Sequence, residues 1–316
     1  MRAMLRGARR VSIRWVRVVA VATWACTVGL IVLGSAVRVT DSGMGCKGWP
    51  LCTGSQGSIA SFHPLMEESH RLLASIVTIL ILLLVWSVRR CERANHLRGP
   101  SLVAVGVILV QIVLGAVTVF AKNAPFTVAL HLLTATLFLG VSSVLAVVAF
   151  IAPERGWSLR TGTSPLGWAA VVGLYSVIIS GSVVVSAGAQ SACAAWPLCL
   201  HSSGATALLV VQTAHRGIVL VASVLVVTFL LVQLRSTRAS GGVVVVARLA
   251  VVLLALQVVV GAMSAIWSSH TELADVHLAV ASLLWSAVVA VFTLSASGAG
   301  AAQEVARRRR SLNVRV

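Results

Sequence analysis

Eight long apolar runs dominate this sequence, and each has about the 20 residues that a helix needs to cross the hydrocarbon core of a bilayer. The runs lie at residues 16–37, 69–88, 100–120, 127–151, 166–187, 206–233, 246–267 and 274–295. They are too long and too continuous for the alternating pattern of barrel strands, so helices are the expected spanning elements. We therefore predict an all-α membrane protein with eight transmembrane helices.

The composition leaves too little polar surface for a soluble protein. Charged residues make up 10% of the 316 residues and hydrophobic residues 58%, whereas soluble domains carry about 25% charged residues. In a soluble protein the net charge of +17 would suggest nucleic acid. Here the arginines fall in short clusters between the apolar runs, so we predict no nucleic-acid partner.

The basic residues predict the orientation of the chain. With the N-terminus inside, 20 of the 25 Lys and Arg residues fall in inner segments, as the positive-inside rule requires. We therefore expect both termini in the cytoplasm, with a basic N-terminal segment at 1–15 and a basic tail at 296–316. The residue usage is typical of a GC-rich bacterium, so the chain is expected to be a multi-pass protein of a bacterial cell membrane.

The second half of the sequence repeats the first. Cys46–Cys52 and Cys193–Cys199 both end in Trp-Pro-Leu-Cys, at an offset of 147. Other residues match at offsets of 145 to 147, namely Gly34 with Gly181, Ser35 with Ser182, His70 with His215, Arg71 with Arg216, Gln111 with Gln257, Gly115 with Gly261 and His131 with His277. Since four helices return the chain to its starting side, we predict two tandem four-helix bundles in a parallel repeat, at 16–151 and 166–295, joined by a cytoplasmic linker at 152–165.

Four of the repeated residues are histidines near the outer ends of even-numbered helices, namely His70, His131, His215 and His277. A polar side chain at that depth needs a partner. Two histidines facing each other across a four-helix bundle can supply both axial ligands of a haem, because imidazole suits iron and bundle cores commonly hold such cofactors. Hydrogen bonding between helices is the alternative. Zinc is less favoured, because no third or fourth inward ligand recurs in each half.

Arg71 and Arg216 directly follow two of these histidines. A guanidinium at this position can pair with haem propionates. It can also extend to lipid phosphate at the membrane surface. The sequence leaves both interpretations open.

The two halves differ beside their first histidine. Glu67 stands three residues before His70, whereas Gln212 stands three residues before His215, and this spacing puts each on the same helix face as its histidine. A carboxylate there can exchange protons or stabilise a cationic intermediate, although Glu67 could also be a helix N-terminal residue favoured by the dipole. Because Arg38 and Asp41 also occur only in the first half, we predict the reaction site there and a resting cofactor site in the second half.

The cysteines fall into two exported pairs and two single residues. An oxidising exterior permits a disulfide within each loop, and the close spacing leaves room for either a structural staple or a redox-active bond. The expected disulfides are Cys46–Cys52 and Cys193–Cys199, with Cys26 and Cys91 as free thiols.

Together these motifs resemble the haem A synthase family over essentially the whole chain. They are Gly34-Ser35 with Arg38, the Cys46 to Cys52 loop, Glu67-x-x-His70-Arg71, His131, His215-Arg216 and His277. The first outer loop departs from the family pattern, since members often carry Gly at the position of Asp41 and Pro-Asp at Lys47-Gly48.

Members of that family oxidise the C8 methyl group of haem O to a formyl group, giving haem A for aa3-type cytochrome oxidases. The resemblance implies a haem b cofactor whose iron is held by His215 and His277. It implies substrate haem O at His70 and His131, with Glu67 needed for turnover. The expected partners are haem O, membrane lipid, haem O synthase and cytochrome oxidase assembly factors, together with an electron acceptor that the sequence does not identify.

Two other classes of membrane protein would share some of these features. A di-haem b-type cytochrome that passes electrons to or from quinone would explain the four histidines, but not a carboxylate in one half alone. A transporter built from parallel repeats would usually contain a helix broken by Gly or Pro at the midplane, and none is evident in the sequence.

Overall fold

The computed structural model describes residues 11–46, 48–50, 52, 61–151, 164–199, 205–237, 239–268 and 270–313, with side chains up to residue 296. The long helices are α1 (Ile13–Val39), α2 (Phe62–Arg90), α3 (Arg98–Phe120), α4 (Pro125–Val148), α5 (Pro165–Ser186), α6 (Thr206–Arg235), α7 (Gly241–Ile266) and α8 (Thr271–Asn313). All eight are long and apolar enough to cross a membrane. The prediction of an all-α, multi-pass membrane protein is therefore confirmed, whereas the parallel repeat, the orientation and the domain bounds stay predictions.

Several predicted segments fall partly outside the described residues. These are residues 1–10 of the basic N-terminal segment, residues 152–163 of the linker, Lys47 in the first outer loop and residues 314–316 of the tail. The rest of the tail continues α8 as far as Asn313, although the predicted helix ends at 295. The tail contains Ala, Gln, Glu and Arg, whose high helix propensity lets the backbone stay helical after the apolar run has ended.

Side-chain caps and prolines fix where several helices begin. Ser12, Ser164 and Ser240 each accept a hydrogen bond from a backbone N–H in the first turn of α1, α5 and α7, which satisfies one of the free donors at a helix start. Pro125 and Pro165 begin α4 and α5, where the missing N–H has no cost. The chain leaves α2 through a 3-10 helix, η2 (Glu92–Leu97), and enters α3 directly.

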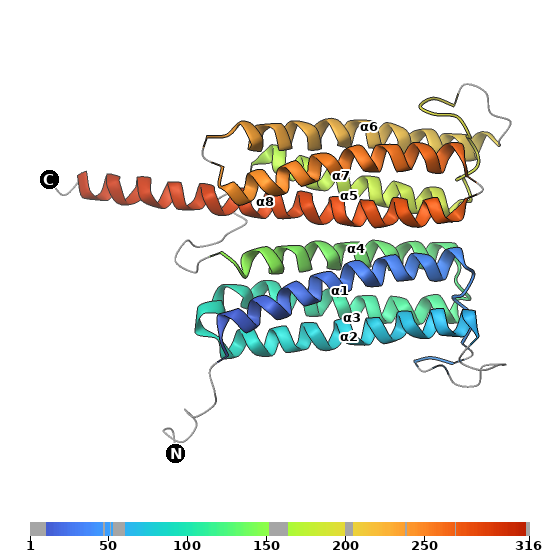
Figure 1. The fold of residues 1–316 in the computed structure, drawn as a ribbon, viewed down its shortest axis with the longest axis horizontal. Coiled ribbons are helices and arrows are strands. Elements are labelled where there is room, and N and C mark those ends of the chain that lie inside the picture. The colour runs from blue at the N-terminus through green and yellow to red at the C-terminus, as the bar shows by residue number, and fades with distance from the viewer. Residues whose placement is uncertain are drawn as a thin grey trace, which may run out of the picture.

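The helices form two groups of four, which we call the N-terminal half (α1–α4) and the C-terminal half (α5–α8). The halves meet along α1, α4, α5 and α8, and α8 lies between α7 and the N-terminal half (Figure 1). The apolar window of α8 is 61% buried, against 17% for the window that contains α3. Thus α8 is an interior helix, whereas α3 presents most of its surface outward.

Aromatic residues join the two halves through backbone carbonyls. The indole N–H of Trp285 in α8 donates to the carbonyl of Thr136 in α4 at 2.9 Å. The hydroxyl of Tyr175 in α5 donates to the carbonyl of Leu133 in α4 at 2.9 Å. The rings of Tyr175 and Trp285 also contact each other, with centroids 5.5 Å apart. These bonds satisfy the polar groups of two large rings and hold the halves in a fixed register.

Candidate functional site

The four repeated histidines lie at one end of the helices, as two pairs. Each is six to nine residues from the start of an even-numbered helix, and each is half-buried. His70 in α2 interacts electrostatically with His131 in α4, and His215 in α6 does so with His277 in α8. The structure therefore brings together the two pairs that the sequence predicts, one in each half.

Every one of these imidazoles packs against a glycine of the preceding helix. The pairs are Gly34 with His70, Gly115 with His131, Gly181 with His215 and Gly261 with His277, and a Cβ built on the glycine would lie 2.8, 3.2, 3.3 and 2.9 Å, respectively, from the imidazole Cε1. The missing side chain is what allows the ring to lie against the neighbouring backbone. The matched glycines of the two halves thus have one shared task, which is to make room for a histidine ring.

In the C-terminal half, both imidazoles have a polar neighbour at Nδ1. Ser180 Oγ lies 2.8 Å from Nδ1 of His215. The side-chain amide nitrogen of Gln257 lies 3.3 Å from Nδ1 and 3.2 Å from Nε2 of His277. Such contacts fix the orientation of a ring and are typical of metal-binding histidines.

In the N-terminal half, the Nδ1 atoms are buried and lack partners. His70 Nδ1 and His131 Nδ1 have no hydrogen-bond partner among the described residues. The side-chain amide nitrogen of Gln111 instead lies 3.1 Å from Nε2 of His131. The matching position for Ser180 is Leu33, so this half has no equivalent hydroxyl.

Both pairs fit a haem better than a bare metal ion. In the described part of the chain, the only group of three candidate metal ligands is Cys46, Cys52 and Glu68, and its two cysteines form a disulfide. A histidine pair without further ligands cannot close a tetrahedral zinc site. Haem carries its own nitrogen ligands for iron, and His70 with His131 and His215 with His277 would supply the remaining ones.

Glu67 is buried and has both carboxylate oxygens engaged. Its exposed fraction is 4%, Oε2 accepts the backbone N–H of Cys46 at 2.8 Å, and Oε1 forms an ion pair with Arg71. Because α2 begins at Phe62 rather than near 69, no acidic residue stands in its first turn. The alternative that Glu67 serves the helix dipole is therefore wrong, because that effect falls off within the first turn.

Gln212 is the matching residue of the C-terminal half and is almost as buried, with an exposed fraction of 6%. Its amide oxygen has no hydrogen-bond partner among the described residues. The amide thus occupies the place of the carboxylate, but its oxygen makes no hydrogen bond to the described part of the neighbouring loop. The structure keeps the difference between Glu67 and Gln212 that the sequence indicates.

Arg71 and Arg216 hold the loops that precede their helices. Nη1 of Arg71 donates to the carbonyl of Gly48 at 2.6 Å. Arg216 donates to the carbonyls of Pro197 at 3.1 Å and Cys193 at 3.2 Å. Sequence reasoning considered haem propionates and lipid phosphate, but not these loop carbonyls. A propionate contact for either arginine stays a prediction.

The segments between α1 and α2 and between α5 and α6 are called here the first and second cysteine loops. Each contains a disulfide, Cys46–Cys52 in the first and Cys193–Cys199 in the second. Cys26 and Cys91 are free. This arrangement agrees with the predicted pairing within each loop.

Asp275 is a polar residue at the site that sequence reasoning missed. The hydroxyl of Ser35 in α1 donates to its carboxylate, and Arg38 in α1 interacts with it electrostatically. Asp275 lies in α8, two residues before His277, and its counterpart is Ala129. An ionisable residue within a predicted transmembrane helix was the available signal. Its partners lie in the other half, so no comparison within one half could have identified them.

Asp41 has a different explanation from the one that its charge suggested. Its φ is +55°, and its counterpart Gly188 has a φ of +67°. Both residues end a helix in the left-handed region, which Gly adopts freely and Asp tolerates better than most residues. The difference between Asp41 and Gly188 therefore reflects a backbone turn and gives no support to a reaction site.

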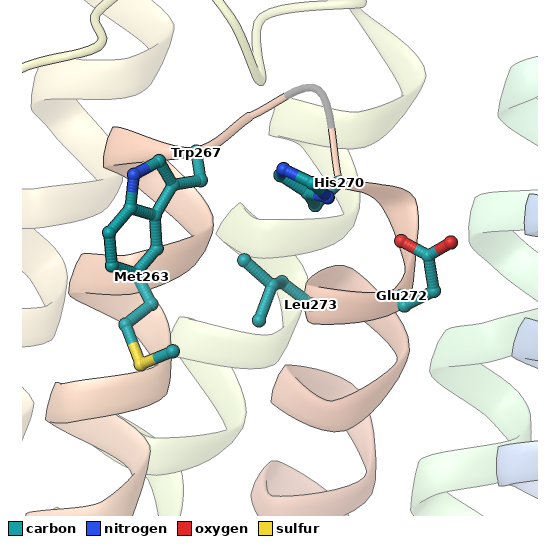
Figure 2. A pocket seen from close by; sticks show the side chains of 5 residues that line it. All are labelled: Met263, Trp267, His270, Glu272 and Leu273. Carbon is teal, nitrogen blue, oxygen red and sulfur yellow. The ribbon is translucent and has the colours of Figure 1, made fainter.

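A shallow depression of about 330 Å³ lies beside the turn between α7 and α8. It is lined by Met263, Trp267, His270, Glu272 and Leu273 (Figure 2). None of the four paired histidines lines it. We therefore place the candidate site at the histidine pairs and not in this depression.

The chain is similar to a group of bacterial proteins with one name. The model of the COX15-CtaA family, described as cytochrome oxidase assembly protein, matches residues 17–62 and 60–289. A protein of Shouchella clausii named heme A synthase is 30% identical over 81% of this chain and 89% of its own length. Heme A synthase of Staphylococcus epidermidis is 24% identical over 90% of this chain and 96% of its own length. Heme A synthase of Alkalihalophilus pseudofirmus is 31% identical over 54% of this chain and 60% of its own length.

Proposed function

We propose that this chain, which belongs to the COX15-CtaA family of cytochrome oxidase assembly proteins, is a haem A synthase that oxidises the C8 methyl group of haem O to a formyl group. The observation that carries the proposal is the pairing of His70 with His131 near the start of the helix that bears the buried carboxylate of Glu67. The product would supply cytochrome oxidases of the aa3 type.

The two histidine pairs are assigned different haems. His215 and His277 would hold a resident haem b, because Ser180 orients the ring of His215 at Nδ1 as a permanent ligand requires. His70 and His131 would hold the substrate haem O, and Nδ1 of His70 has no hydrogen-bond partner among the described residues, so this ring can tilt as a molecule enters and leaves. When bound, haem iron supplies the redox chemistry that the protein side chains lack.

The conversion needs two hydroxylations of one carbon, and each removes two electrons from it. The resulting geminal diol loses water to give the aldehyde. This last step needs one proton delivered to the departing hydroxyl and one removed from the remaining hydroxyl. A carboxylate can do both in turn, and Glu67 is the buried carboxylate on the α2 face that bears His70. Its bond to the backbone N–H of Cys46 fixes where that proton would be exchanged.

The setting proposed for this reaction is the cell membrane of a bacterium, with both termini in the cytoplasm and the cysteine loops outside. Haem O synthase is the proposed source of substrate, and cytochrome oxidase assembly factors are the proposed recipients of product. An electron acceptor must also contact the protein. Its chemical class is open.

A single extraction experiment tests the function against its main rival. The chain is expressed with a source of haem O, and the acid-extracted haems are separated and identified. New haem A supports the synthase. Unchanged haem O together with a reversible b-type spectrum would instead support a di-haem cytochrome, for which the difference between Glu67 and Gln212 has no purpose.

A further inference from the structure

Two side chains near the start of α8 contact different halves of the molecule. The ring of His277 packs against Gly261 of α7, within the C-terminal half. Asp275 stands two residues earlier, about 200° away around the helix, and its carboxylate accepts the hydroxyl of Ser35 in α1. The helix that offers a candidate iron ligand to one half therefore also supplies a carboxylate to the other half.

Ser35 connects this carboxylate to the N-terminal histidine pair. It is buried, with an exposed fraction of 4%, and it directly follows Gly34, the residue that makes room for the ring of His70. A hydrogen bond to an ionised acceptor is stronger than one between neutral groups, and a packed interior yields little to small displacements. The bond from Ser35 to Asp275 therefore holds the part of the α1 backbone against which His70 packs.

Arg38 offsets the charge of this carboxylate. An ionisable side chain within a membrane-spanning helix is costly unless it has a partner. Arg38 lies three residues after Ser35, on the same face of α1, and interacts electrostatically with Asp275. Both charged residues are half-buried. Ser35, Arg38 and Asp275 thus form a polar cluster across the contact between the halves, which we call the seam cluster.

The contact between α4 and α5 provides an internal comparison, because it matches the contact between α1 and α8. The residues that match Ser35, Arg38 and Asp275 are Ser182, Val185 and Ala129, respectively. The hydroxyl of Ser182 donates to the carbonyl of Ile179 in its own helix. The second contact therefore keeps the serine but has neither charge, so the matched position of the N-terminal half offers no carboxylate to the C-terminal pair.

We propose that Asp275 is a positioning residue for the N-terminal histidine pair, supplied by the C-terminal half and acting through Ser35. Asp275 fixes α1 at Gly34, and Gly34 in turn sets where the ring of His70 lies. The N-terminal pair therefore binds haem at full strength only with α8 in place, and the first four helices are not a complete site. The inference rests on the proposed haem-binding role of the pairs, but not on the oxidation of haem O.

The test measures haem binding at each pair separately in the purified full chain. His215→Ala disables the C-terminal pair without changing α8, and His70→Ala disables the N-terminal pair. Haem b is the probe in both backgrounds, because the packing at Gly34 acts on the histidine ligand and not on the side chains of the haem. The low-spin absorption of haem with two histidine ligands is titrated in each background, with and without substitutions in the seam cluster.

We expect Asp275→Ala to weaken binding at the N-terminal pair by about 10-fold, the low end of the effect of groups behind a metal ligand. Binding at the C-terminal pair should stay unchanged, although Asp275 is only two residues from His277. Asp275→Asn keeps an oxygen that can accept the bond from Ser35, so it should bind haem more tightly than Asp275→Ala. Ser182→Ala is the matched control and should leave the N-terminal pair unchanged.

A double-mutant comparison tests whether Asp275 acts through Ser35. Ser35→Ala should reproduce the loss at the N-terminal pair, and the double variant should lose no more than the weaker-binding single variant, because both substitutions remove the same bond. Losses that multiply in the double variant would overturn the proposal, since the two residues would then act independently.

Three results with Asp275→Ala alone would also overturn the proposal. Unchanged binding at the N-terminal pair would show that the carboxylate does not position it. Equal losses at both pairs would indicate general loosening of the fold, and a loss confined to the C-terminal pair would mean that Asp275 acts on its own helix. The proposed function would survive each of these results, because it is tested by the formation of haem A.

Discussion

Ser180 lies 2.8 Å from Nδ1 of His215 in the C-terminal half, whereas the matching residue of the N-terminal half is Leu33 and Nδ1 of His70 has no partner among the described residues. Both rings nevertheless pack on a glycine of the preceding helix. The halves thus share the shape that admits an imidazole and differ in what orients it. Under the proposed function, this contrast would let one histidine arrangement hold a resident cofactor in one half and a passing substrate in the other, depending on the groups behind the ligands.

The two cysteine loops also differ, but here the N-terminal half has the additional contacts. In the N-terminal half, Glu67 bonds to the backbone of Cys46 and to Arg71. In the C-terminal half, Arg216 donates to carbonyls of the loop, but the amide oxygen of Gln212 has no partner among the described residues. The half with the freer histidine rings therefore has the more firmly tied loop. A site that exchanges its ligand would need such a fixed edge.

The largest effect is expected from substituting Glu67, the carboxylate that distinguishes the first half from the second. Glu67→Gln should lower haem A formation by about 10²–10⁴-fold, the usual contribution of acid–base catalysis, and should leave the haem of the C-terminal pair in place. Gln212→Glu should not create a second active site, because Arg38 has no counterpart there. The measurement is the ratio of haem A to haem O and alcohol intermediate in acid extracts. Near-normal haem A from Glu67→Gln would remove the carboxylate from the mechanism.

The second prediction concerns the hydroxyl behind His215. Ser180→Ala should weaken haem binding by the C-terminal pair by about 10–100-fold, as loss of a contact behind a metal ligand usually does. Leu33→Ser is the reciprocal change and should tighten binding at His70. Spectroscopic haem titration of the two variants measures both effects. If Ser180→Ala binds haem as tightly as the unchanged protein, orientation of the ring does not distinguish the halves.

The third prediction compares two serines that match in sequence and differ in partner. Ser35 donates to the carboxylate of Asp275 in the other half, whereas Ser182 donates to the carbonyl of Ile179 in its own helix. Ser35→Ala should cost about 1.5–3 kcal/mol, the value for a bond to a charged group, and Ser182→Ala about 0.5–1.5 kcal/mol. Thermal unfolding in one detergent compares them. Equal losses would mean that the contact between the halves adds nothing to stability.

The smallest expected difference lies between the glycines. A Cβ at Gly34 would lie 2.8 Å from His70, and one at Gly181 would lie 3.3 Å from His215. Overpacking lowers the free energy of unfolding by about 1–3 kcal/mol. The loss should be near the upper end of that range for Gly34→Ala and at or below its lower end for Gly181→Ala. Thermal unfolding of each variant in one detergent is the measurement. A larger loss for Gly181→Ala than for Gly34→Ala would show that these distances do not determine how closely each histidine ring packs on its glycine.

Features that repeat along the chain could be predicted from the sequence. The apolar runs predict the helices because a bilayer imposes one length on each of them. The constant offset identified His70, His131, His215 and His277 because the same rare residues recur in register. The loop disulfides followed from paired cysteines in exported segments. In each case the signal is local or periodic.

Features that depend on side-chain partners or on backbone angles could not be predicted in this way. A hydropathy window loses the first turns of α2, because the polar residues before Ser69 hide seven residues of helix. The contact of Ser35 with Asp275 joins residues 240 positions apart. The charge of Asp41 gave no warning that its φ is positive. Each error arose because composition does not show what a residue faces.

The central place of α8 has a consequence for how the protein is made. A chain emerges from the ribosome N-terminus first, so α8 reaches the membrane after α1–α7. His70 and His131 lie on α2 and α4 and can pair early, whereas His277 lies on α8 itself. The faces of α1 and α4 that pack on α8 can be covered by it only after α8 has been inserted. Insertion of α8 therefore completes both the C-terminal histidine pair and the contact between the halves.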